Sequence, residues 1–138
     1  MTPIKQTILG SKGNCFDACI ASILDLEIND VPNLNAHLEN GLWVSVLNKW
    51  LASFGLSYMA VTIPFSDIDL YFENKDFYHI IIGHTDRSSP LLHAVVGRKG
   101  KMVFDPHPTG LGLMVDKTLM VGIFVHTGLK EAKEREGE

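Results

Sequence analysis

The sequence has few cysteines, few prolines and no long apolar run. It contains two cysteines and six prolines in 138 residues. Two cysteines cannot build the disulfide framework of a small secreted domain, and the apolar runs are far too short to span a bilayer. Residues 1–6 also lack the apolar segment of a signal peptide. We therefore expect free thiols, no membrane segment and a cytoplasmic location.

The sequence also lacks an excess of positive charge, because its formal net charge is −4 at pH 7. A general nucleic-acid-binding surface needs many lysines and arginines, so we expect no nucleic-acid partner. The 46% of hydrophobic residues is enough for a core, and no repeat or linker divides the chain. We expect a single domain over 1–138, with an irregular arm at 1–13 and a charged tail at 128–138.

The pattern of apolar residues predicts helices first and strands afterwards. One apolar stripe predicts a helix from Cys15 to about Leu26, and another predicts a helix over 42–54 that ends before Gly55. The segment 67–76 is expected to cover a sheet edge or to join layers. The expected strands cover 56–63, 78–83, 91–97, 101–104 and 120–126. This order predicts an α+β domain in which two helices pack on an antiparallel sheet.

The first predicted helix begins at a cysteine. Asn14 is a good N-cap, Gly13 permits a sharp turn, and Asp17 suits the positive end of the helix dipole. Cys15 then occupies the first helical position, where unpaired N–H groups and the dipole favour a thiolate. A nucleophilic cysteine needs this environment. Cys19, one turn deeper beside the apolar stripe, is expected to belong to the core.

Six histidines are candidates for a general base, and hairpin geometry favours one of them. A three-residue loop at 98–100 would pair Gly97 with Lys101. The same register places His93 directly opposite Asp105, on one face of the sheet. The carboxylate would then orient the imidazole and stabilise its charged form. A two-residue loop would instead place the two side chains on opposite faces.

The other histidines are weaker candidates. His79 alternates with apolar residues in a predicted strand and is the main rival base. His107 lies in the stretch 105–108, which either shapes the rim of a cleft or forms a rigid turn, and we favour the turn. The remaining three have no partner in the sequence and are expected at the surface or in turns: His37, His84 and His126.

A zinc site is a further interpretation of the same side chains. The potential zinc ligands are Cys15, Cys19, His93 and Asp105. However, two cysteines spaced by three residues on one helix, without a second close pair, are a weak zinc pattern. We therefore expect neither a metal nor a cofactor.

The order of these motifs resembles the papain-like cysteine peptidase fold. The resemblance lies in the cysteine at a helix start, the strand histidine of residues 93–96 and the Asp-Pro pair at 105–106. The pattern is most similar to the bacteriocin-leader (double-glycine) peptidase domains of peptide exporters. Residues 13–16 and 105–108 also resemble stretches of small bacterial and phage papain-like proteins.

This resemblance implies roles for individual residues. Cys15 would be the nucleophile, His93 the general base and later acid, and Asp105 the orienting carboxylate. The family usually has a glutamine a few residues before the cysteine, whose amide helps to bind the oxyanion. Gln6 is the candidate here, although it lies nine residues upstream. Asn14 is a possible substitute donor.

These observations predict a thiol-dependent hydrolase that cleaves a peptide, isopeptide or other amide bond through an acyl-enzyme. Its partner would be a peptide or protein substrate. Two alternatives remain open. One is a catalytically silent papain-like binding module, such as a bacterial or phage accessory protein. The other is an enzyme that transfers the acyl group to an amine or deamidates a side chain.

Overall fold

The computed structural model describes residues 1–10, 13–37, 40–85, 92–114 and 118–127; the predicted tail at 128–138 lies outside this part. The helices are α1 (Cys15–Leu24), α2 (Trp43–Leu51) and α3 (Ile68–Phe72), and the short 3-10 turns are η1 (Ile28–Asp30), η2 (Leu34–His37), η3 (Ala52–Phe54) and η4 (Phe65–Asp67). The strands are β1 (Leu56–Pro64), β2 (Tyr78–His84), β3 (Leu92–Arg98), β4 (Lys101–Phe104) and β5 (Thr118–His126). The predicted α+β class is therefore confirmed.

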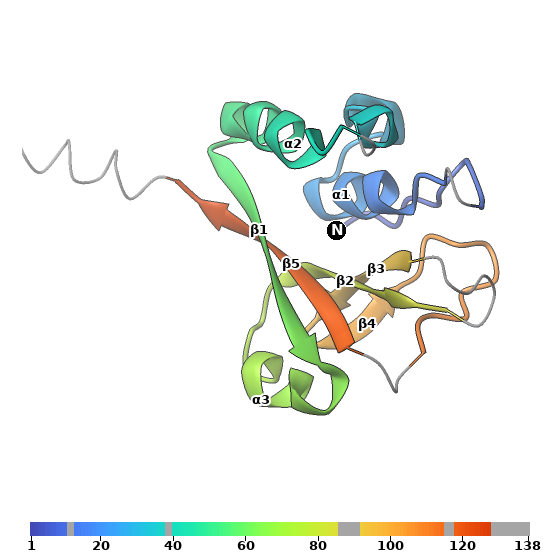
Figure 1. Ribbon diagram of the computed structural model, residues 1–138, viewed down its shortest axis with the longest axis vertical. Coiled ribbons are helices and arrows are strands. Elements are labelled where there is room, and N and C mark those ends of the chain that lie inside the picture. The colour runs from blue at the N-terminus through green and yellow to red at the C-terminus, as the bar shows by residue number, and fades with distance from the viewer. Residues whose placement is uncertain (11–12, 38–39, 86–91, 115–117, 128–138) are drawn as a thin grey trace, which may run out of the picture.

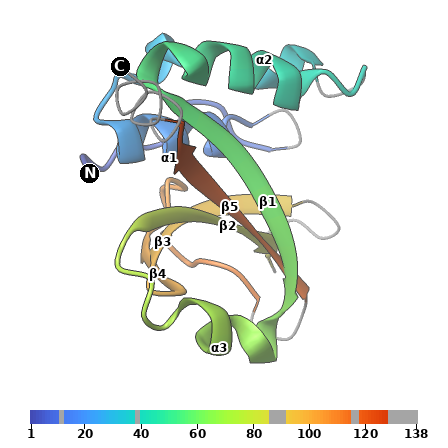
Figure 2. The ribbon, with the colours of Figure 1, turned by 90° about the vertical axis from the view of Figure 1, so that its left-hand side faces the viewer.

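The strands form one antiparallel sheet in the order β1-β5-β2-β3-β4 (Figure 1). Successive side chains of a strand point to opposite faces of the sheet. In this sheet apolar residues point both ways, so that each face has its own apolar cluster. On one face, α1 and α2 pack over Tyr58, Ile80 and Val96. On the other face, α3 packs over Ile81 and Val95 (Figure 2). The segment 67–76, expected to cover a sheet edge or to join layers, thus contributes α3, which covers the second face.

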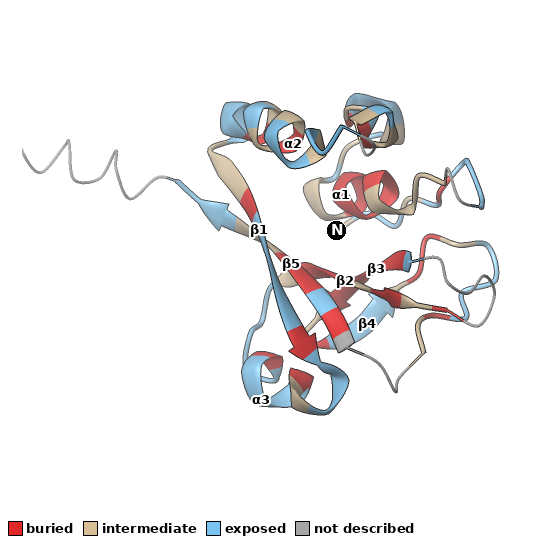
Figure 3. Ribbon diagram, in the orientation of Figure 1, coloured by how far each residue is buried: buried red, intermediate tan, exposed pale blue. Residues whose placement is uncertain are grey.

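The helix that carries the cysteine is buried against the sheet (Figure 3). Cys19 and Ile20 are fully buried in the core that α1 shares with β2 and β3, which confirms the prediction for Cys19. The helix ends two residues before the predicted position, because Asp25 adopts a left-handed conformation with φ 57°. The second helix also follows the prediction, although its last turn is the 3-10 turn η3.

The turn between β3 and β4 differs from the predicted one. It contains two residues, Lys99 and Gly100, with φ of 56° and 78°. Two consecutive left-handed residues are typical of the type I′ turn that joins two strands tightly. As a result Arg98 faces Lys101, and the predicted pairing of Gly97 with Lys101 is wrong.

A β-bulge then shifts the register of this hairpin. Val96 pairs with Phe104, so β4 contains one residue more than the facing part of β3. With the two-residue turn alone, odd-numbered residues of β3 would face even-numbered residues of β4. The extra residue of the bulge reverses this, so that beyond the bulge odd-numbered residues of the two strands point to the same face. The predicted direct pairing of His93 with Asp105 is therefore wrong, but both side chains remain on one side of the hairpin.

His79, the rival base, is a fully buried residue on β2. Its ring lies near the rings of Phe72 and Phe77, and its Nε2 accepts a hydrogen bond of 3.1 Å from the N–H of Gly100. Its Nδ1 has no partner in the described part of the chain. Burial lowers the pKa of His79 to about 4. The residue therefore supports the β3–β4 turn as a neutral imidazole.

We expect His79 to make the protein sensitive to acid. An unfolded histidine has a pKa near 6.5, so between about pH 6.5 and 4 the unfolded chain binds a proton that the native chain excludes. The free energy of unfolding should fall across this range, by up to about 3 kcal/mol for a shift from 6.5 to about 4. Urea denaturation at pH 7 and 4.5 should show a smaller loss for His79→Gln than for the wild type. Equal losses would contradict this role.

Candidate active site

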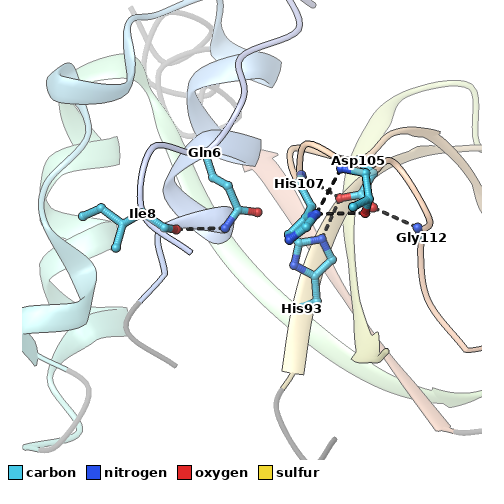
Figure 4. A network of polar contacts seen from close by, with 7 residues as sticks. Gln6, Ile8, His93, Asp105, His107 and Gly112 are labelled. Atoms are coloured by element: carbon cyan, nitrogen blue, oxygen red, sulfur yellow. Dashed lines mark hydrogen bonds and ion pairs between the residues drawn. The ribbon is translucent and has the colours of Figure 1, made fainter. Parts of the chain in front are cut away.

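His93, near the start of β3, and Asp105, directly after the end of β4, form a buried ion pair (Figure 4). His93 Nε2 lies 2.6 Å from Asp105 Oδ1, and both side chains are buried. Asp105 also accepts backbone N–H groups from His107 at 2.9 Å and from Gly112 at 2.8 Å. A buried carboxylate needs such partners in place of water. The contact predicted from the sequence is confirmed, although the bulged hairpin creates it by a different register.

The charges of this pair stabilise one another. Burial raises the pKa of Asp105, but the bond to His93 and the two N–H donors outweigh it and lower the pKa to about 2. Burial likewise opposes the charged form of His93, but hydrogen bonds to Asp105 and Cys15 raise its pKa to about 9. Because Asp105 occupies Nε2, Nδ1 is the ring nitrogen left for the sulfur. The thiol of Cys15 therefore adds to the effect of Asp105 on the pKa of His93.

Cys15 is the first residue of α1, as predicted, and is partly exposed. Asn14 precedes it but makes no side-chain capping bond. Its Oδ1 instead accepts the N–H groups of Thr7 and Ile8, each at 2.9 Å. Asn14 therefore occupies the predicted N-cap position, but its side chain bonds to the folded-back arm and not to the helix N–H groups. The outcome is that Asn14 holds the N-terminal arm against the start of the helix.

Gln6 lies beside the cysteine loop in spite of its distance in sequence. Its Nε2 donates to the carbonyl of Ile8 at 2.9 Å, and a Cβ added at Gly13 would meet that nitrogen at 3.3 Å. Its backbone N–H donates to the carbonyl of Pro106 at 3.0 Å. Gln6 Oε1 is buried and has no partner among the described residues. The arm thus brings the Gln6 amide to the junction of the cysteine loop and the segment after β4.

The turn η2, which the sequence did not predict, supports the helix start from another side. Asn35 Nδ2 donates to the carbonyl of Gly13 at 2.6 Å. The Asp17 carboxyl is hydrogen-bonded to the backbone of Leu34, but burial outweighs this bond and raises the pKa of Asp17 to about 6. Burial also raises the pKa of Cys19 well above that of an ordinary thiol. The two cysteines therefore lie in different environments, one at the surface of the site and one in the core.

His107 lies beside His93, which agrees with the role at the cleft rim that the sequence analysis considered but did not favour. Its ring meets the ring of His93 edge-on, with centroids 6.0 Å apart and an interplanar angle of 84°. Its Nδ1 accepts the N–H of Thr109 at 3.1 Å, so the ring is fixed in place. The motif at 105–108 had suggested either a cleft rim or a rigid turn, and the turn was favoured. The other histidines lie as expected: His37 and His84 are partly exposed and His126 is exposed.

No protein-family model matches the chain, and neither the curated proteins nor the solved structures contain a significant match. In the described part of the chain, no group of three or more His, Cys, Asp or Glu side chains could hold a metal ion. The described helices are also too short or too polar to cross a membrane. The chemistry of the site is therefore inferred from its geometry.

We expect an NMR titration of the His93 ring to give a midpoint near pH 9. This pKa lies above the unfolded value of about 6.5, so the pair stabilises the fold fully below pH 6.5 and loses that effect as pH rises through 9. Asp105→Asn should lower the midpoint by roughly one unit or more, because the imidazolium loses its counter-charge.

A matched control for this titration is Asp76→Asn. It removes an exposed ion pair of similar length, 2.7 Å between Asp76 Oδ1 and Arg98 Nε. The His93 midpoint should not change in this variant. An unchanged midpoint in Asp105→Asn would show that the carboxylate does not set the charge of His93.

Proposed function

We propose that this chain is a thiol-dependent hydrolase of peptide or isopeptide bonds with papain-like chemistry. The observation that carries the proposal is the position of His93. One ring nitrogen bonds to Asp105 at 2.6 Å, and Cys15 also contributes to the raised pKa of this ring. A nucleophile, a base and an orienting carboxylate are the parts of a catalytic triad. The substrate would be a peptide or protein, and the free thiol suits a reducing compartment such as the cytoplasm.

The reaction proceeds through an acyl-enzyme. Cys15 attacks the carbonyl carbon as a thiolate, with its proton held on His93. The tetrahedral intermediate then expels the amine, which takes the proton from His93, and a thioester remains on the sulfur. His93 next removes a proton from water, which hydrolyses the thioester and releases the acid. Asp105 keeps the ring oriented and stabilises the imidazolium in both halves.

The oxyanion requires hydrogen-bond donors near the sulfur. The N–H of Cys15 is one of those that a helix leaves unpaired at its start. Gln6 Nε2 carries a second proton beyond the one that it donates to Ile8. The bonds of Gln6 to the carbonyls of Ile8 and Pro106 hold this residue in place. We assign the Cys15 N–H and the Gln6 amide to the oxyanion.

The first test is alkylation with iodoacetamide, followed by mass spectrometry of each cysteine. Cys15 should react at least about a hundredfold faster than Cys19, because Cys19 is fully buried. His93→Ala should slow the reaction of Cys15 roughly tenfold or more at neutral pH, since the thiolate loses its cationic partner. His79→Gln is the control and should leave the rate unchanged. Equal, slow labelling of both cysteines would exclude the proposal.

The second test separates oxyanion binding from thiol reactivity. Gln6→Ala should lower the rate of acylation by an activated ester, such as p-nitrophenyl acetate, by roughly 10²-fold. Alkylation of Cys15 by iodoacetamide should stay close to the wild-type rate, because alkylation forms no oxyanion. Thr2→Ala, elsewhere on the same arm, is the control for both reactions. A parallel loss of both rates would remove Gln6 from this role. Absence of acyl-enzyme in the wild type would favour the binding-module alternative.

A further inference from the structure

The two edges of the sheet are built differently. β4 has four residues, begins with Lys101, contains a bulge and is followed by Pro106 within two residues. Such features keep an edge strand from pairing with another chain. β1, at the other edge, has nine residues and no charged side chain. Its middle part, residues 59–62, is exposed (Figure 3).

The register of β1 shows which of its backbone groups point away from the sheet. The carbonyl of Gly55 accepts the N–H of Thr127 at 2.9 Å, in continuation of the β1–β5 register. In antiparallel pairs, hydrogen-bonded and non-hydrogen-bonded positions alternate. Odd-numbered residues of β1 therefore bond to β5, and even-numbered residues direct their N–H and C=O groups outward. Tyr58 follows this rule, because its N–H donates to Asn48 Oδ1 on α2 at 2.7 Å.

The outward edge of β1 is closed at both ends and open in the middle. Asn48 occupies the N–H of Tyr58 at one end, and Pro64 has no N–H at the other. Between them lie Ala60 and Thr62, whose outward groups bond to no described residue. Beside them, Met59 and Val61 present apolar side chains that are 50% and 37% exposed.

We propose that two copies of this chain associate through β1, antiparallel, with Val61 on the two-fold axis. In this register Ala60 faces Thr62 of the second copy. Each of the two symmetry-related pairs exchanges two N–H···O bonds. Val61 faces Val61, and Met59 faces Ile63, which covers exposed apolar side chains across the axis. The two five-stranded sheets become one continuous sheet.

A second copy fits this edge better than an unrelated peptide because the strand is complementary to itself. With Val61 on the axis, Tyr58 faces Pro64 of the second copy. Asn48 already holds both the N–H and the C=O of Tyr58, and Pro64 has no N–H to donate to that C=O, so this pair requires no bond between the copies. A neutral strand also faces its copy without like-charge repulsion, which directly opposed charges would cause. Cys15 takes no part, so this inference is independent of the proposed function.

Sedimentation of the full chain over a concentration series up to about 1 mM tests the association. The wild type should shift from the mass of one chain towards twice that mass. Thr62→Pro removes an outward N–H that β5 does not use, and Val61→Lys places two charges on the axis. Each should weaken association at least about tenfold. The matched control is Val125→Lys, since Val125 is 41% exposed on the inner strand β5.

Cross-linking tests the register itself. In a Cys15→Ser background, Val61→Cys should form an intermolecular disulfide under mild oxidation, because Cβ atoms at a directly opposed non-hydrogen-bonded position lie about 4.5–5.5 Å apart. Met59→Cys should cross-link at least about tenfold more slowly, since it faces Ile63. A wild type that stays monomeric throughout would overturn the proposal. So would a dimer that survives both Thr62→Pro and Val61→Lys, or equal cross-linking of the two cysteine variants.

Discussion

The architecture of the candidate site depends on one buried carboxylate. Removing a charge from water costs several kcal/mol unless other groups replace the water. Asp105 obtains these groups from the backbone N–H of His107, the backbone N–H of Gly112 and the ring of His93. The segment after β4 must therefore curve around the carboxylate, because the N–H groups of His107 and Gly112 both reach its oxygens. The orientation and charge of the imidazole follow from this arrangement.

The same segment connects the sheet to the N-terminal arm. The carbonyl of Pro106 accepts the N–H of Gln6, while Asn14 holds the other end of the arm against the helix start. Gly13 is required between them, because a Cβ there would lie 2.9 Å from two carbonyl oxygens, those of Gly10 and Ile8. An arm without regular secondary structure thus holds a helix start and a strand end in one unit. Its rigidity comes from side-chain-to-backbone bonds, which a short irregular segment needs in place of a ladder.

Side-chain spacing was enough to predict α1, α2, the strands and the meeting of His93 with Asp105, but not the short helix α3. It was not enough to predict the route by which they meet. Lys99 adopts a positive φ that non-glycine residues rarely take, and the bulge in β4 compensates for the shorter turn. Both depend on how the hairpin packs, which no local pattern records. The position of Gln6 also depends on tertiary contacts that the sequence pattern does not show. The Asn14 side chain bonds to the N-terminal arm and not to the helix N–H groups.

The two buried histidines of β2 and β3 show how the register of the strands determines the charge of a histidine. His79 and His93 are both buried strand residues, yet the pKa of the first falls to about 4 and that of the second rises to about 9. Burial favours the neutral ring in both cases. Among the described residues, His79 bonds only to the N–H of Gly100, so burial prevails, whereas His93 has a carboxylate that reverses the direction of the shift. Without the extra residue of the bulge, Asp105 would project from the opposite side of the hairpin. His93 would then be a buried, neutral ring like His79, without the proton that a leaving amine requires.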